Sequence, residues 1–144
     1  MDYVGRFAPS PTGPLHYGSL VAAVASFLDA RHAGGKWLLR IEDLDPPRES
    51  IDAPQEIIRQ LLALGLHWDL EVLCQSSRLS SYDAALKSIQ PFTFPCACSR
   101  KAVPDVYPGT CRLRKHLTQD RPTAVRLQVP RRSVSINDRC LGLQ

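Results

Sequence analysis

The sequence predicts an α/β fold built on a parallel sheet, and three observations support this prediction. Apolar segments typical of strands alternate with longer segments typical of helices up to about Gln90. Glycines follow the helical segments, whereas proline-rich or acidic loops follow the strand-like ones. The composition is that of a globular protein, with 44% hydrophobic and 22% charged residues. It excludes a disordered tail, a coiled coil and a collagen-like fibre.

The first half of the chain carries the clearest element signals. We expect a short strand over Tyr3–Phe7 and then a helix over Tyr17–His32, which is apolar on most sides and should therefore be buried between other elements. A strand over Lys36–Ile41 ends in an acidic loop. The next helix begins near Asp52, has Pro54 near its first helical position and ends at Gly65.

The second half is more irregular. We expect a short strand over Glu71–Gln75, a helix over Ser77–Ile89 and a strand over Thr123–Val129. The chain ends on Gly142-Leu143-Gln144, where we expect no closing strand. An apolar stretch at Leu20–Leu28 is too short to span a membrane, so we expect no membrane partner and a cytoplasmic location.

Charge is distributed unevenly along the chain. Residues 1–95 carry 8 Lys or Arg and 11 Asp or Glu, whereas residues 96–144 carry 10 and 3. A basic excess confined to one end indicates phosphate-rich ligands at that end. We therefore expect two functional regions, 1–95 and 96–144.

One candidate site follows the first strand, where RFAPSPTG leads into His16-Tyr17-Gly18-Ser19. A helix N-terminus at the carboxyl end of a strand offers free N–H groups to a phosphate. His16 can donate to a phosphate oxygen, Gly18 gives a flat base access to the backbone, and Arg6 can pair with a carboxylate. Taken alone, these residues fit a proline-rich turn with a surface histidine even better, because His-x-Gly is a weak motif.

A second candidate site is a group of three cysteines, Cys96, Cys98 and Cys111, within sixteen residues. In a chain without an export signal, clustered thiols favour a metal, and zinc is the usual ion. Spacing alone favours His116 as the fourth ligand, because imidazole is a far more frequent ligand than phenolate. Three reduced cysteines in a buried hairpin are the alternative.

A family resemblance is carried by RFAPSPTG with LHYGS, and by LLRIEDLD one helix later. These segments resemble the N-terminal catalytic half of glutamyl-tRNA synthetases, class I enzymes whose signature ends in His-x-Gly-His. Ser19 stands where the second histidine would be, and PPRE follows the acidic loop. Both details resemble the truncated branch of the family, the glutamyl-queuosine tRNA(Asp) synthetases, which activate glutamate with ATP and attach it to the queuosine base of a tRNA.

The resemblance covers nearly the whole chain and implies the N-terminal half of a Rossmann-type catalytic domain with a zinc-bound insert. It places the ATP- and glutamate-binding part in residues 1–95, and the zinc-binding, basic insert with the start of the remaining catalytic domain in 96–144. His16 and Gly18 would face ATP, which would bring Mg²⁺ in the family's reaction, and Glu42 would hold the α-ammonium of L-glutamate. One wall of the glutamate pocket would consist of Arg6, Phe7, Ala8, Pro9 and Ser10. Without the resemblance, a solvated loop acid is an equally good interpretation of Glu42.

The same resemblance implies a Cys-x-Cys…Tyr-x-x-x-Cys zinc site. The residues that fit it are Cys96, Cys98, Tyr107 and Cys111, which puts Tyr107 in place of His116. Four protein ligands leave no open position, so the zinc would be structural. Basic residues around it would meet a tRNA backbone: Arg100, Lys101, Arg112, Arg114 and Lys115.

The chain departs from the family in one respect. Class I synthetases carry a later Lys-Met-Ser-Lys-Ser-like signature, whereas Met1 is the one methionine of this sequence. We therefore expect an incomplete form of the domain, a monomer, with little glutamate-dependent ATP–pyrophosphate exchange. Three alternatives remain at this stage: a fragment of a glutamyl-tRNA synthetase, another nucleotidyltransferase of the superfamily, and a noncatalytic zinc-dependent RNA-binding module.

Overall fold

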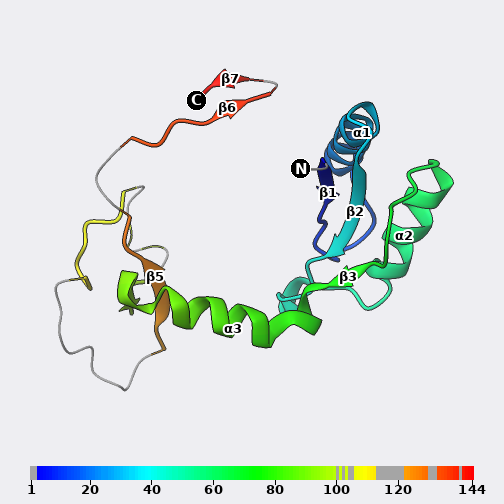
Figure 1. Cartoon of the computed structure of the whole chain (residues 1–144). Helices are drawn as coiled ribbons and strands as arrows, with labels where there is room; N and C mark the ends of the chain where they lie inside the picture. Colours follow the sequence, from blue (N-terminus) through cyan, green and yellow to red (C-terminus); the bar gives the residue numbers. More distant parts are fainter. Residues whose placement is uncertain are drawn as a thin grey trace. The chain divides into compact units, whose positions relative to one another are not determined.

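The computed structural model describes residues 3–99, 101, 103, 106–112, 122–129, 133–139 and 141–144. Its contacts divide the chain into two compact units, Met1–Asp83 and Ala84–Gln144 (Figure 1). The first unit contains the expected parallel sheet, and the second contains the cysteines of the candidate metal site.

The sheet of the first unit has the strand order β1-β2-β3, with β1 at Val4–Phe7, β2 at Lys36–Ile41 and β3 at Leu73–Cys74. Both strand pairs are parallel, which confirms the prediction of a parallel α/β unit. β2 has the expected bounds, and β1 and β3 lie within the expected segments.

Two helices accompany this sheet, and their ends follow the signals in the sequence. Helix α1 spans Tyr17–His32, as expected, and Gly34 after it adopts a φ of +61° that favours glycine. Helix α2 spans Ala53–Ala63 with Asp52 as its N-cap, and Gly65 after it has a φ of +70°. The short 3-10 helix η1 (Pro46–Arg48) connects β2 to α2.

The core of the first unit lies on one face of the sheet. Figure 1 shows α1 running alongside β1 and β2, and Ile57 and Leu61 of α2 join the same apolar cluster. Because neighbouring side chains on a strand point to opposite faces, this arrangement separates two sets of strand residues. The core set comprises Gly5, Phe7, Trp37, Leu39 and Ile41, which are all buried.

The expectation that helix α1 is buried between other elements is wrong, because the helix is exposed on most sides. Only Ala23 and Ala30 are buried, whereas Val21, Val24 and Leu28 are 39–58% exposed. The physical reason is the close approach of the helix to the sheet. A Cβ added to Gly5 would lie 3.0 Å from the Cβ of Ala30, so small residues form the closest contact with the sheet. Of the larger residues, Phe27 packs against Trp37 at 5.2 Å between ring centroids, whereas Val21, Val24 and Leu28 lie on the exposed side.

The polypeptide passes into the second unit through helix α3 (Leu79–Ser88). This helix begins later than expected because Gln75–Arg78 forms the 3-10 helix η2. After the short η3 (Gln90–Phe92), strand β4 (Thr93–Cys96) pairs with β5 (Ala124–Leu127) in antiparallel fashion. β5 confirms the expected strand, whereas β4 was not expected.

The end of the chain differs from the expectation. Strand β6 (Asn137–Asp138) pairs with β7 (Gly142–Leu143), so a strand does lie at the last residues. Gly142 has a φ of +73°, and this conformation allows the tight return of the chain. In the part of the chain that the structure describes, no helix combines the length and apolarity that crossing a membrane requires.

Candidate functional site

The two loops that carry the family motifs lie side by side in the first unit. The backbone N–H of Glu42 donates to the carbonyl oxygen of Pro9 at 2.9 Å, and the N–H of Ser50 donates to that of Pro11 at 2.9 Å. The first loop follows β1 and the second follows β2, so both lie at the carboxyl ends of parallel strands. Open α/β sheets bind ligands at this position.

A pocket of about 410 Å³ opens along the first of these loops. The predicted ATP-facing residues His16 and Gly18 line this pocket. Four of the five residues of the predicted glutamate wall line it too: Phe7, Ala8, Pro9 and Ser10. Phe7 also belongs to the core, where it stacks on Trp37 at 6.3 Å between ring centroids.

His16 is held at the N-terminus of α1 by Ser19. It is the N-cap residue, and its Nδ1 accepts a hydrogen bond from the N–H of Ser19 at 3.3 Å. The tautomer in which Nδ1 accepts carries its proton on Nε2, which lies 3.1 Å from Ser19 Oγ. A Cβ added to Gly18 would lie 3.1 Å from Cε1 of His16, so the glycine makes room for the ring.

Arg6 lines a different pocket from its sequence neighbours, because strand alternation directs Arg6 and Phe7 to opposite faces of the sheet. This second pocket, of about 350 Å³, also contains Arg40, Arg78 and Tyr82. Sequence reasoning missed these three residues, although the alternation of LLRI in β2 places Arg40 on the same face as Arg6.

Glu42 is connected to this second pocket through Arg40. Its carboxylate forms an ion pair with the guanidinium of Arg40, while Nε of Arg40 is buried without a hydrogen-bond partner among the described residues. An acid and two arginines, Glu42, Arg6 and Arg40, therefore occur around the pocket on the face of the sheet opposite the core.

The other acids of the β2 loop are engaged within the chain. Asp43 accepts hydrogen bonds from the N–H of Ser76 at 2.9 Å and from its Oγ at 2.5 Å. Burial alone would raise the pKa of Asp43, but these hydrogen bonds outweigh burial and lower the pKa below its ordinary 3.8. Asp45 forms an ion pair with Arg48. These contacts fix the loop that carries Glu42.

The second unit brings the three predicted thiol ligands together. The sulfurs of Cys96, Cys98 and Cys111 all lie within 4.8 Å of one another, and those of Cys98 and Cys111 are 3.5 Å apart. Cys96 ends β4, whereas Cys111 comes from a loop that follows it in the sequence. Three converging sulfurs fit the soft, tetrahedral preference of zinc.

Tyr107 joins this group through its hydroxyl. Its Oη lies 3.6 Å from Sγ of Cys96 and accepts a hydrogen bond from the N–H of Cys111 at 2.8 Å. Burial alone would raise the pKa of the Cys96 thiol, but hydrogen bonds from Tyr107, the Cys98 backbone and Arg126 outweigh it and lower the pKa to about 6. Burial raises the pKa of the Tyr107 phenol above its ordinary value of 10.

Some predicted residues fall outside the described part of the chain. These are His116, the alternative zinc ligand, and the basic residues Arg100, Arg114 and Lys115. Of the remaining predicted basic residues, Lys101 and Arg112 are both exposed, and the guanidinium carbon of Arg112 lies 5.5 Å from the centroid of the Phe94 ring.

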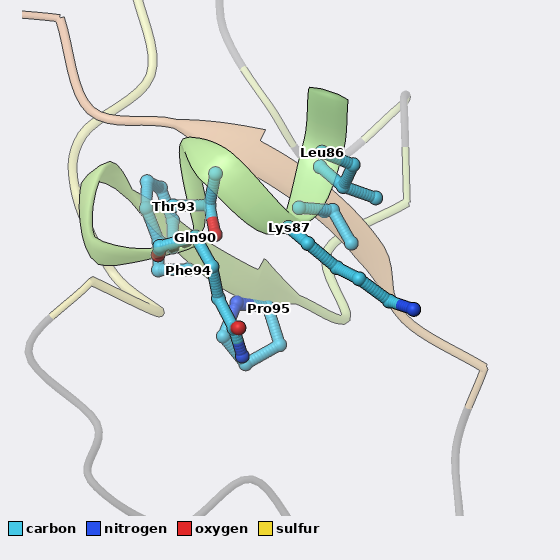
Figure 2. Close-up of a pocket in the computed structure, with 7 residues that line it drawn as sticks. Leu86, Lys87, Gln90, Thr93, Phe94 and Pro95 are labelled. Atoms are coloured by element: carbon cyan, nitrogen blue, oxygen red, sulfur yellow. Dashed lines mark hydrogen bonds between the residues drawn. The ribbon is translucent and has the colours of Figure 1, made fainter. Parts of the chain in front are cut away.

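A further pocket of about 510 Å³ lies in the second unit, where the end of α3 meets the β4–β5 pair. Figure 2 shows Lys87 extending away from Gln90, Thr93 and Phe94 along one side of this pocket. Its lining is mostly apolar and contains none of the predicted substrate or metal residues.

The parallel sheet and the paired motif loops define a synthetase catalytic domain. The chain belongs to the class I tRNA synthetases (E and Q), whose catalytic-domain model matches residues 3–101. This membership confirms the resemblance, and the following relatives refine it.

Among the curated relatives, the glutamyl-Q tRNA(Asp) synthetase of Ectopseudomonas mendocina (strain ymp) is 48% identical over 145 residues, covering 97% of this chain and 49% of the relative. The protein of the same name from Thiobacillus denitrificans is 52% identical over 151 residues, covering 96% of this chain and 50% of the relative. The chain thus spans about half the length of the curated relatives it matches.

Solved structures agree with this family assignment. The chain matches a glutamate tRNA ligase from Elizabethkingia meningosepticum, crystallised in complex with its amino acid, with a TM-score of 0.84 and 26% identity. The glutamate-tRNA synthetase of Elizabethkingia anophelis gives the same values. In both matches the alignment covers 100% of this chain and 36% of the other.

Proposed function

We propose that this chain supplies the ATP- and glutamate-binding half of an enzyme that activates glutamate and transfers it to the queuosine base of tRNA(Asp). The observation that carries this proposal is the hydrogen bond between Glu42 N and Pro9 O, which joins the two motif loops. The names of the curated relatives support the choice of RNA.

In the proposed reaction, a carboxylate oxygen of glutamate attacks the α-phosphorus of ATP. The new P–O bond gives glutamyl-adenylate, and pyrophosphate leaves with the electron pair of the bond that breaks. Transfer of the glutamyl group to RNA follows. Such a step needs no side-chain nucleophile, because positioning the reactants and stabilising phosphate charge supply the catalysis.

For glutamate we propose that Arg6 pairs with a carboxylate and that Glu42 holds the α-ammonium. Arg40 supports both roles, since it lines the pocket with Arg6 and pairs with Glu42. We keep Phe7, Ala8, Pro9 and Ser10 as proposed residues of the glutamate wall, although they line the pocket of His16 and not the pocket of Arg6. The hydrogen bond between the two motif loops supports a role for both loops in binding.

For ATP we propose that His16 and Gly18 receive the nucleotide at the N-terminus of α1. The shared pocket and its position at the N-terminus of α1 support this assignment. Mg²⁺ would arrive with the nucleotide, whose phosphates supply most of its ligands.

For the second region, 96–144, we propose a structural zinc site held by Cys96, Cys98, Tyr107 and Cys111. The convergence of three sulfurs and the tyrosine hydroxyl supports it. Bound zinc would stabilise a segment with a small core, and its basic residues would contact the tRNA backbone. We retain the division between residues 95 and 96, a monomer and a cytoplasmic location as predictions.

The proposal is tested by calorimetric titration of the chain with a non-hydrolysable glutamyl-adenylate analogue. We expect binding that Glu42→Gln weakens by on the order of tenfold, because the substrate ammonium loses its anionic partner. Asp52→Asn is the matched control, since it makes the same change from acid to amide at an exposed residue whose side chain makes no capping hydrogen bond. Absence of binding by the zinc-loaded, folded chain, together with binding of tRNA, would favour a noncatalytic RNA-binding module instead.

A further inference from the structure

Arg126 occupies an unusual position in the second unit. It lies on β5 directly opposite Phe94 of β4, so it shares the face of this strand pair that carries the buried Phe94 and Cys96. An arginine on an inward face is rare unless it is paired with an anion. Nε of Arg126 is buried and has no hydrogen-bond partner among the described residues.

Arg126 lies against the candidate metal site. Its guanidinium carbon lies 4.8 Å from the centroid of the Tyr107 ring, and its side chain hydrogen-bonds the sulfur of Cys96. The ring of Phe94 stacks on the ring of Tyr107, with 5.8 Å between the two ring centroids. Arg126 therefore contacts the two candidate ligands whose donor atoms are 3.6 Å apart, Cys96 and Tyr107.

The net negative charge of the proposed ligand set explains why a guanidinium beside Cys96 and Tyr107 would be favourable. Three thiolates and one phenolate around Zn²⁺ carry two net negative charges, whereas a histidine as the fourth ligand would leave one. The tyrosine-containing set thus has one more negative charge to stabilise inside the protein, and a fixed guanidinium beside the thiolate and the phenolate provides the compensating charge.

We propose that Arg126 is a positioning residue that stabilises the zinc-bound form of Cys96 and Tyr107 by charge compensation, and that it makes tyrosine usable as the fourth ligand. This inference rests on the zinc site proposed above. It assigns a role to a residue outside the ligand set, and partners of this kind tune both the orientation of ligands and the affinity for metal.

The experiment measures zinc affinity of the full chain at one fixed pH by competition with a chromophoric chelator. We expect Arg126→Gln to weaken binding by on the order of 10- to 100-fold. Arg126→Lys keeps the charge and should lose less than Arg126→Gln. Lys87→Gln is the matched control, because Lys87 is an exposed cation of the second unit that lines a pocket without predicted metal ligands, and it should leave the affinity nearly unchanged.

A double-mutant cycle with Tyr107→Phe separates charge compensation from a general structural role. If Arg126 acts through Tyr107, the loss caused by Arg126→Gln should be smaller when Tyr107 is already Phe. The absorption of bound Co²⁺, a spectroscopic substitute for zinc, should also change in Arg126→Gln and stay unchanged in Lys87→Gln. Circular dichroism of each metal-loaded variant checks its fold.

Equal losses in Arg126→Gln and Lys87→Gln would overturn the inference. So would equal losses in Arg126→Lys and Arg126→Gln in folded protein, or full additivity in the cycle with Tyr107→Phe. A wild-type chain that binds no zinc would remove both proposals. If the wild-type chain binds zinc and Arg126→Gln binds it with unchanged affinity, this inference alone is wrong.

Discussion

The backbone amide of Glu42 donates a hydrogen bond to the carbonyl oxygen of Pro9, with 2.9 Å between the two atoms. This bond joins segments more than thirty residues apart in the sequence, the proline-rich loop after β1 and the acidic loop after β2. Both loops begin at the carboxyl ends of neighbouring parallel strands, so the bond holds the two motifs together at that end of the sheet.

Gly18 should be intolerant of a side chain because of its contact with His16. In Gly18→Ala the new Cβ would lie 3.1 Å from Cε1 of the imidazole and displace the ring from its position beside Ser19. We expect ATP to bind on the order of fivefold more weakly, measured by calorimetry. Tyr17→Ala is the control, because Tyr17 is 82% exposed and does not line the pocket. An equal loss in both variants would argue against a specific role for the His16 position.

Ile57 should contribute strongly to the stability of the first unit. It is fully buried in the core that supports the sheet, so Ile57→Ala should lower the free energy of unfolding by about 2–5 kcal/mol. Urea denaturation followed by the fluorescence of Trp37 and Trp68 measures this change. Ile51→Ala should have little effect, since Ile51 is 89% exposed. Comparable losses in the two variants would contradict the described core.

Asp69 should make stability depend on pH. Hydrogen bonds from Arg31 and from the backbone N–H of Trp37, both at 2.7 Å, lower the pKa of Asp69 below its ordinary 3.8. The unfolded state therefore binds the proton more readily, so the stabilisation is complete above about pH 4 and is lost as pH falls through the folded-state pKa.

We expect Asp69→Asn to lower the free energy of unfolding at pH 7 and to differ less from wild type as the pH falls below 4. Urea denaturation at a series of pH values measures this difference. Asp52→Asn is the control, because the side chain of Asp52 makes no capping hydrogen bond. A difference between Asp69→Asn and wild type that stays constant down to pH 2 would refute the electrostatic explanation.

The metal site predicts about one zinc ion per chain in protein purified without chelators, measured by elemental analysis. Cys98→Ser should lose the zinc because it removes one of three converging sulfurs. Cys74→Ser should retain it, since Cys74 is exposed and lies outside the cluster. Zinc-free wild-type protein, or retention of zinc by Cys98→Ser, would remove the proposed site.

Local signals predicted the first unit well. β2 and α1 have the expected bounds because strand alternation, Gly34 and Gly35 mark their ends in the sequence. β4 was missed because Pro95 lies within it, and proline argues against a strand that has partners on both sides. β4 pairs only with β5 in the described structure, so the missing N–H is tolerated.

The sites were harder to predict, because their residues meet through tertiary contacts. The motif residues Arg6 and Phe7 are adjacent in sequence but lie on opposite faces of β1. Arg40 and Arg126 were missed since an arginine within a strand is usually interpreted as exposed. Only the pairing of the strands places Arg126 opposite Phe94 and beside the cysteines. By contrast, the short spacing of the cysteines was sufficient to predict their cluster.

Selectivity for the amino acid tests the central claim most directly, since the family includes enzymes for glutamate and for glutamine. The measurement is a competition between non-hydrolysable glutamyl- and glutaminyl-adenylate analogues for the wild-type chain. Because Arg6 and Arg40 line a pocket suited to a carboxylate, we predict that the glutamyl analogue binds at least about tenfold more tightly. Equal or tighter binding of the glutaminyl analogue would contradict the account.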